Sequence, residues 1–282
     1  MVLELIADPA AAARHPGRTV LLGFLYSCVA IVLSLWIFRQ SASLVAVFLT
    51  VIAAFPVFYD TIRRLERKEE QHGSGRLLWR EHSAAVQGLF YLFLGVMVAF
   101  AVWYTLVPSA HLETLFSSQT QAISGVQGFA TAPFAGDRMG FFAEVLLNNL
   151  SILLFCVLFS FLYGAGAVFI LIWNASVIGV AVGNFIRMGV AQAAQMLGAG
   201  GAYFHVVSLG ILRYALHGIP EVIAYLIASL AGGIISMGLY RSRGNLHATK
   251  ELLSDALELT GAAIILLVIS AWIEAFVSTA VF

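Results

Sequence analysis

The sequence predicts an all-α polytopic integral membrane protein, a helical bundle of about seven transmembrane helices with a range of six to eight. Of the 282 residues, 61% are hydrophobic and only 11% are charged, with a mean hydropathy of +0.93. Soluble domains carry about 25% charged residues. Apolar runs as long as a membrane span recur along the whole chain. One of them, 203–240, is too long for a single straight span and contains ionisable residues in its middle.

Seven apolar runs are the candidate spans, because a helix needs about 20 apolar residues to cross the hydrocarbon core. In chain order they are residues 19–38, 43–59, 86–108, 142–163, 165–186, 203–240 and 259–282. The fourth and fifth runs follow each other almost without a break. We therefore expect a tight helical hairpin, with its turn at Gly164-Ala165-Gly166.

The distribution of lysine and arginine predicts the orientation in the membrane. Segment 60–85 is rich in basic residues, whereas the first two outer loops would contain only Arg39 and Arg138. The basic residues of the segment are Arg63, Arg64, Arg67, Lys68, Arg76 and Arg80. We expect a multi-pass protein of the cell (cytoplasmic) membrane with its N-terminus in the cytoplasm.

Three parts are expected along the chain. Residues 1–85 would form a two-span hairpin followed by a charged cytoplasmic segment. Residues 86–140 would add a third span and an outer loop, and residues 141–282 would form the main membrane domain. The outer loop, 109–140, is rich in Ser, Gln and Gly and has few charges. It is expected to be an irregular lid or an interfacial segment.

The sixth run is interrupted by His217-Gly218-Ile219-Pro220-Glu221. Gly218 permits unusual backbone angles, and Pro220 suits the first turn of a new helix, where its missing N–H is not needed. Glu221 would lie in that turn, where the helix dipole favours negative charge. The pattern predicts a discontinuous helix that restarts at a carboxylate. Two possibilities remain for residues 203–217, which either span or re-enter, and the side of the C-terminus depends on which holds.

Polar side chains inside the apolar runs should face other helices or a wet cavity, because lipid offers them no hydrogen bonds. The predicted intramembrane polar cluster consists of Glu144, Asn148, Asn149, Asn174, His217, Glu221 and Glu274. Three interpretations are open: hydrogen bonds that hold helices in register, a transport or ligand site, and a metal or catalytic site. The first is favoured.

Enzymatic signatures are absent from the sequence. It has no His-Glu-x-x-His zinc motif, no phosphate-binding loop and no Gly-x-Ser-x-Gly nucleophile elbow. His217 and Glu221 alone are two metal ligands, where about three or four are usual. We expect no enzyme activity, no cofactor and no bound metal.

Small residues at four-residue spacing predict two helix faces that pack closely, because they let backbones approach. In the fifth run these residues are Gly179 and Gly183, and in the sixth run they are Ala224, Ala228, Gly232 and Ser236. We expect the two faces to pack against each other or against further copies of the chain in an oligomer.

Four short motifs occur in order across about residues 141–282. They are the pair Asn148-Asn149, the pair Trp173-Asn174 ahead of a Gly-rich helix, His217-Gly218-x-x-Glu221, and Ile273-Glu274-Ala275. Together they resemble the stage II sporulation protein M family of multi-span membrane proteins. The resemblance implies that residues 141–282 form a membrane domain of this kind, with the polar cluster as a typical feature.

The resemblance also implies a class of function. In spore-forming bacteria, family members look like scaffolds that work with a peptidoglycan hydrolase and another membrane partner during engulfment of the forespore. Because the family also occurs in organisms without spores, we do not transfer the sporulation role. The preferred function is a non-enzymatic scaffold or partner subunit of a membrane complex. The alternative is a transporter or permease-like protein with a ligand or proton site at the broken helix, and an intramembrane hydrolase is least favoured.

The expected partners follow from the apolar surface and the charge balance. They are the lipid bilayer, other membrane proteins and further copies of the chain. No nucleic-acid partner is expected, because 15 basic and 15 acidic residues leave no net charge.

Overall fold

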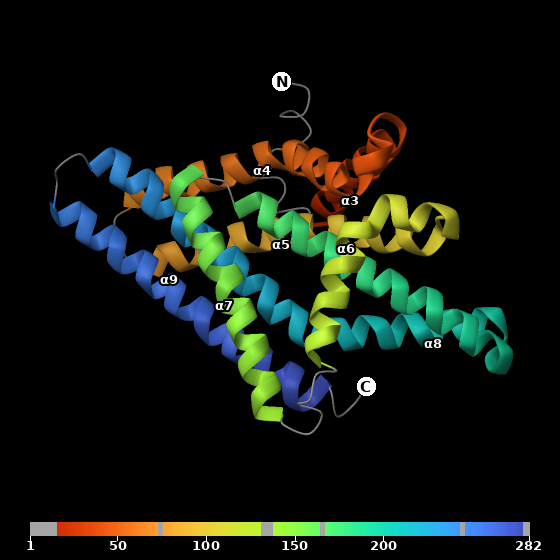
Figure 1. The fold of residues 1–282 in the computed structure, drawn as a ribbon. Helices are drawn as coiled ribbons and strands as arrows, with labels where there is room; N and C mark the ends of the chain where they lie inside the picture. The colour runs from red at the N-terminus through yellow and green to blue at the C-terminus, as the bar shows by residue number, and fades with distance from the viewer. Residues whose placement is uncertain (1–15, 73–75, 131–137, 164–166, 243–245, 279–282) are drawn as a thin grey trace.

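The computed structural model describes residues 16–72, 76–130, 138–163, 167–242 and 246–278. Within these residues every regular element is a helix, which confirms the all-α class (Figure 1). The elements are α3 (Pro16–Ile37), the 3-10 helix η1 (Arg39–Ser41), α4 (Ala42–His72), α5 (Arg76–Leu106), α6 (Ser109–Ala130), α7 (Arg138–Tyr163), α8 (Ala167–Ser242), α9 (Leu246–Trp272) and the π-helix η2 (Ile273–Ser278). The predicted turn at 164–166 lies outside the described residues.

Seven stretches of the described helices are long and apolar enough to cross a membrane. They are Gly17–Ile37, Arg39–Thr61, Ser83–Leu106, Arg138–Phe161, Ala167–Val190, Ala215–Ser236 and Leu253–Ser278. Each overlaps one of the seven predicted runs, and the sixth span, Ala215–Ser236, takes up only part of the run 203–240. The prediction of a multi-pass membrane bundle is therefore confirmed.

Helix α8 contains two of these spans and folds back on itself between them, at the right-hand side of Figure 1. A Cβ atom on Gly189 would lie only 2.5 Å from Cγ1 of Val206, although a straight helix would separate the two residues by about 25 Å. We call residues 167–190 the first limb and residues 206–242 the second limb of α8.

The predicted break at His217–Glu221 is wrong. The helix continues through these residues with Pro220 inside it, and the chain reverses farther upstream, between the two limbs. The sequence of the reversal contains Gly198, Gly200 and Gly201, and glycine restricts the backbone least. A proline inside a helix removes one hydrogen bond and bends the helix. Such a bend persists where neighbouring helices supply replacement partners.

The first limb packs against α5 through its small-residue face. A Cβ atom on Gly179 would lie 2.5 Å from the carbonyl oxygen of Met97, and one on Gly183 would lie 2.8 Å from that of Ala101. On the second limb, a Cβ atom on Gly232 would lie 2.5 Å from the carbonyl oxygen of Val157 in α7.

Both small-residue faces therefore meet another backbone within the chain. Ala224 and Ala228, on the same side of the second limb as Gly232, are fully buried, whereas Ser236 is partly buried. The partners of the glycines are α5 and α7, so the expectation that the two faces meet each other is wrong, and the possible homo-oligomer stays a prediction. The reversal of α8 is the reason, because it lets each limb pack against a different neighbour.

A further close approach joins α3 to α5. Gly23 lies against the backbone of Leu92, and Gly95 lies against the backbone carbonyl of Val20, so a Cβ atom at either glycine would overlap the opposite helix. This pair of glycines was not predicted from the sequence. The glycines allow two helix axes to approach more closely than larger side chains would permit.

Residues 109–130 form helix α6, so the expectation of an irregular outer loop is wrong for this part of it. Leu112, Leu115, Phe116 and Ile123 follow the spacing of one helix face. Leu115 and Phe116 are fully buried, and the Phe116 ring centroid lies 5.3 Å from that of Tyr104. The alternative that this segment is interfacial stays a prediction.

Buried polar contacts attach α6 to its neighbours. Ser43 of α4 donates a hydrogen bond to Oε1 of Gln119 (2.8 Å), and Nε2 of Gln119 donates to Oγ of Ser176 in the first limb (3.4 Å). Gln119 is fully buried. Since an unpaired amide would be costly there, these contacts fix the position of α6.

The side chain of Arg187, in the first limb of α8, binds the connection between α5 and α6. The Arg187 guanidinium donates hydrogen bonds to the carbonyl oxygens of Tyr104 (3.2 Å) and Val107 (2.7 Å) and to Oγ of Ser109 (2.8 Å). A positive charge is favourable at a helix C-terminus, where carbonyl groups lack helical partners.

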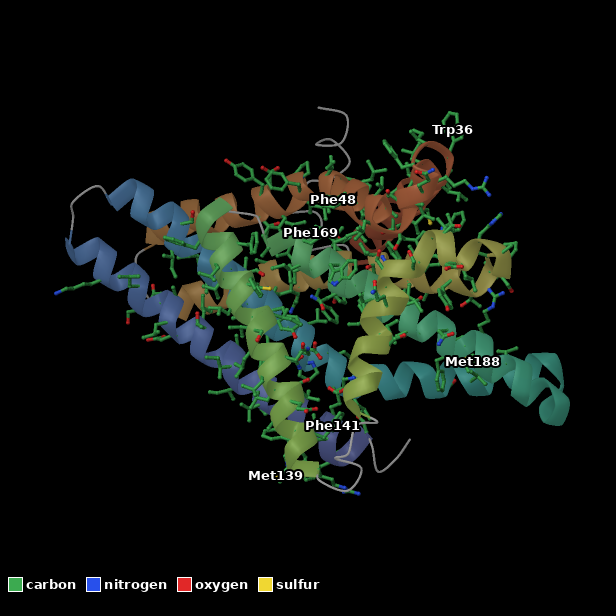
Figure 2. All side chains as sticks on the ribbon, in the orientation of Figure 1. Trp36, Phe48, Met139, Phe141, Phe169 and Met188 are labelled. Atoms are coloured by element: carbon green, nitrogen blue, oxygen red, sulfur yellow. The ribbon has the colours of Figure 1, made fainter. Side chains whose placement is uncertain are left out.

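The helices of the bundle form two groups, according to the limb of α8 that they contact. Helices α4, α5 and α6 each contact the first limb, and Figure 2 shows Phe48 of α4 near Phe169 of that limb, with ring centroids 5.1 Å apart. Helices α7 and α9 contact the second limb. Leu226 of the second limb and Val168 of the first limb line the same small apolar cavity, so the two halves share one core.

We predict that Gly95→Ala lowers the thermal unfolding midpoint of the purified protein, corresponding to a loss of about 1–3 kcal/mol, because the added methyl group overlaps the Val20 carbonyl. Gly88→Ala is the matched control in the same helix, since no atom lies within 4 Å of its added Cβ. The control should be neutral or slightly stabilising, because alanine favours helix. Equal midpoints for the two variants would contradict the close packing of α3 and α5.

Candidate functional site

The candidate site lies where α7, the second limb of α8 and the end of α9 meet. Helix α9 continues directly into η2, the π-helix that contains Glu274. Figure 1 shows η2 near the start of α7, at the lower end of the view. The ring centroids of Phe142 in α7 and Phe276 in η2 are 6.5 Å apart. Residues that are distant in the sequence are therefore brought together here.

Two serines attach His217 to α9 and η2. Ser270 donates a hydrogen bond to the backbone carbonyl oxygen of His217 (2.7 Å), and Oγ of Ser278 lies 3.3 Å from Nδ1 of the same residue. Pro220 has no N–H for the carbonyl group of Leu216, and its ring disturbs that turn. The Ser270 hydroxyl supplies an extra donor in the turn that the proline weakens. Helix α9 thereby supports α8 at this point.

Two carboxyl groups belong to the helices that meet at this contact. Glu221 follows His217 by one turn, and Glu274 lies between the two serines along the chain. The carboxyl groups of Glu221 and Glu274 are close enough to repel each other when both are charged, and both residues are partly buried. The hydroxyl of Tyr225 donates a hydrogen bond to Oε1 of Glu221 (2.9 Å). Like charges in a medium of low dielectric constant are costly.

Helix α7 contributes an amide with an unused donor. Asn149 is only 4% exposed, and its Nδ2 has no hydrogen-bond partner. Cys156 of α7 approaches Ser229 of the second limb, and Val157 meets Gly232. The two helices therefore run parallel. Asn149 lies two turns before Cys156, on the same face of α7.

Glu144 is the other predicted site residue of α7 with an unsatisfied polar atom. It is partly buried, and its Oε2 is enclosed without a hydrogen-bond partner. It lies in the first part of α7, close in sequence to Phe142, which contacts η2. Residues two apart on a helix point to nearly opposite sides, so Glu144 does not share the face of α7 on which Phe142 meets η2.

Two predicted site residues lie elsewhere. Asn148 is exposed, and its Nδ2 donates to Oδ1 of Asn149 (3.3 Å). Asn174 belongs to the first limb, where its Nδ2 donates to the carbonyl oxygen of Ile170 in its own helix (2.8 Å). The structure thus attaches His217 to Ser270 and Ser278, on either side of Glu274 in the sequence, and lets the carboxyl groups of Glu221 and Glu274 interact electrostatically.

The polar side chains of the candidate site offer carboxyl, amide and hydroxyl oxygen atoms and one imidazole, that of His217. Among the described residues, no group of three or more His, Cys, Asp or Glu side chains is placed to hold a metal ion. Such a set can form hydrogen bonds between helices, exchange protons or coordinate a hard cation through oxygen.

Three features of this site and of the helices that support it were not predicted from the sequence. Gln119 was not identified, although it lies on the apolar face of α6 with Leu115 and Phe116, and a polar residue in such a face signals a buried contact. Arg187 lies at the end of a span, where a basic residue is ordinary, so the sequence carried no signal for its contacts. The π-helix around Glu274 also had no sequence signal.

The comparisons with known proteins gave one match. A family model described as stage II sporulation protein M matches residues 88–279. The match begins within α5, whereas the motifs in the sequence predicted about residues 141–282. No curated protein and no solved structure matches the chain.

We predict that Ser270→Ala lowers the thermal unfolding midpoint, corresponding to a loss of about 1 kcal/mol, because the His217 carbonyl loses a donor from α9. Thr260→Ala is the matched control, since the Thr260 hydroxyl donates to the carbonyl oxygen of Ala256 in its own helix (2.8 Å) and not to another helix among the described residues. Differential scanning fluorimetry in detergent would measure both. A Ser270→Ala variant as stable as the control would contradict the supporting role of α9.

Proposed function

Because the chain belongs to the stage II sporulation protein M family, we propose that this multi-pass membrane protein is a non-enzymatic scaffold or partner subunit of a membrane complex. The proposal concerns the class of function and not sporulation itself. We place the protein in the cell membrane with its N-terminus in the cytoplasm, as the basic residues of segment 60–85 favour.

The observation that supports this proposal is the exposed face of α7. Only 22% of the span Arg138–Phe161 is buried, the smallest share among the spans in the described part of the chain. The exposed residues include Leu147, Ser151, Leu154, Leu158 and Phe161. Their spacing alternates between four and three residues, which is the pattern of a helix that packs along a second helix.

A polar side chain lies on this exposed face. Asn148 is ten residues beyond Arg138, which is about 15 Å along the helix and close to the middle of a hydrocarbon core of about 30 Å. Lipid chains offer its amide no hydrogen bond, whereas a neighbouring helix can. The occupant that we infer for this face is a transmembrane helix of a partner protein, with a polar group opposite Asn148.

We predict that Asn148→Ala reduces the amount of a stoichiometric membrane partner that co-purifies from native membranes by several-fold, because the amide contact between the helices is lost. The thermal midpoint of the isolated chain should fall by no more than the loss of one hydrogen bond, about 1 kcal/mol, since the side chain is exposed and donates to Oδ1 of Asn149. Gln121→Ala removes an exposed amide from α6 and serves as the control. Quantitative mass spectrometry after mild solubilisation would measure the partner.

Two results would contradict the scaffold proposal. One is a partner retained by the Asn148→Ala variant at the wild-type ratio. The other is the repeated absence of any stoichiometric partner from the wild-type protein under these conditions.

A transporter or permease-like protein is the second candidate function. The observation that favours it is the carboxyl pair Glu221 and Glu274 beside a proline-containing helix, since transporters place ionisable groups at irregular helices.

If the protein is a proton transporter, wild-type protein in liposomes should conduct protons, which a pH-sensitive dye would measure. Glu221→Gln should abolish this flux. Glu258→Gln, at an exposed position of α9, is the control. Wild-type flux equal to that of empty liposomes would rule out proton transport.

A further inference from the structure

We propose that the partner helix on the exposed face of α7 carries a primary amide, that of an Asn or Gln side chain, and that this amide pairs with Asn148. The pairing rests on the partner helix of the proposed function and adds its chemistry. It follows from the hydrogen bond that Asn148 forms within the chain and from those that it leaves open.

The amide of Asn148 has unused hydrogen-bonding capacity. A primary amide carries two N–H donors and one acceptor oxygen. One donor of Asn148 binds Oδ1 of Asn149 (3.3 Å), and the described residues offer its side chain no other hydrogen bond. One N–H group and the Oδ1 atom are therefore open. They lie near the middle of the span Arg138–Phe161, where lipid chains supply neither a donor nor an acceptor.

The backbone of α7 cannot satisfy both open groups. A side-chain donor in a helix can bond the carbonyl oxygen one turn earlier, and Ser151 donates in this way to Leu147 (2.8 Å). Asn174 of α8 does the same with Ile170 (2.8 Å). An acceptor has no such route, because the N–H groups inside a helix are already bonded to carbonyl groups. The Oδ1 atom of Asn148 thus needs a donor from outside α7.

Asn149 holds the amide of Asn148 in a fixed direction. Asn149 is only 4% exposed, so close packing restricts its side chain, and its Oδ1 accepts the hydrogen bond from Asn148. An orientation that exists before binding lowers the entropy cost of association. The two open groups of Asn148 are thus presented together on the exposed side of α7.

These two open groups define the chemistry of the partner. A primary amide can donate to Oδ1 of Asn148 and accept from its open N–H at the same time. A carboxylate only accepts and a lysine or arginine only donates, so each would leave one group unpaired and place a charge in the lipid core. A hydroxyl can bond its own helix backbone instead, as that of Ser151 does. The group that matches Asn148 is therefore a second amide.

The residues around Asn148 leave room for a helix to approach. Leu147 and Leu154 are 65% and 55% exposed, and the small Ser151 lies between them. Ser151 follows Asn148 by three residues, so the two side chains share a helix face. A small residue beside a polar one lets two transmembrane helices come within hydrogen-bonding distance.

Model peptides test the chemistry of the partner. Each peptide is a leucine helix of about 20 residues with Asn, Gln, Ser, Asp or Leu at its centre. Energy transfer between dyes on the peptide and on the full-length protein in phosphatidylcholine vesicles measures binding, after correction for association of the peptide with itself. We expect the Asn and Gln peptides to bind wild-type protein about 3- to 30-fold more tightly than the Leu peptide does.

Variants of the protein show whether Asn148 causes this preference. Asn148→Leu should bind all five peptides as weakly as wild type binds the Leu peptide, whereas Asn148→Gln should keep the preference because it keeps a donor and an acceptor. Gln121→Leu removes an exposed amide from α6 and should leave the preference unchanged. Circular dichroism checks that each variant keeps the wild-type helix content, and the five peptides on wild-type protein test the pairing independently of any variant.

Three outcomes would overturn the amide pair. Wild-type protein could bind the five peptides equally, in which case lipid or an apolar helix covers the face. The Ser or Asp peptide could bind as tightly as the Asn peptide, which would assign the partner to another chemical class. Wild-type copies could transfer energy to one another in a way that Asn148→Leu abolishes, in which case the occupant is a second copy of the chain.

Failure of the amide pair is distinguishable from failure of the scaffold proposal. If Asn148→Ala loses its native partner while wild-type protein shows no preference among the peptides, the scaffold stands and the amide pair falls. If wild-type protein prefers the Asn and Gln peptides but no native partner co-purifies, the amide pair stands and the scaffold falls.

Discussion

Close backbone packing along the two limbs of α8 is the interaction on which the rest of the structure depends. The first limb meets α5 at Gly179 and Gly183, and the second limb meets α7 at Gly232. Because both limbs belong to one helix that folds back on itself, the N-terminal helices and the pair α7 and α9 are held to a common element. A larger residue at any of the three glycines would separate backbones that now touch.

The candidate site exists because of this arrangement. Pro220 weakens the second limb within a helix that does not end there, and Ser270 of α9 binds the backbone in that turn. Glu274 follows Ser270 by four residues, and its carboxyl group interacts electrostatically with that of Glu221. One serine–carbonyl hydrogen bond thus attaches α9 to the turn of α8 that contains the proline. The polar groups of the site are consequences of helix packing and not of a local sequence motif.

Part of the candidate site could be predicted from the sequence and part could not. Glu221, Glu274 and His217 were identifiable because ionisable residues in apolar runs are costly and so must meet a partner. Asn148 and Asn149 were equivalent in the sequence, yet one is exposed and the other buried. Adjacent helix positions point about 100° apart, so the rotation of α7 about its axis decided between them.

The sequence by itself determined the seven spans and the all-α class, because hydropathy and span length are properties of each segment alone. It could not determine where α8 reverses. His217–Glu221 carries the stronger local signal for a break, with both a glycine and a proline, but the chain turns between residues 190 and 206. Only tertiary structure decided this, because a bent helix at Pro220 is tolerated once α9 supplies a donor. Which backbones the glycines touch was likewise decided by packing between segments distant in the chain.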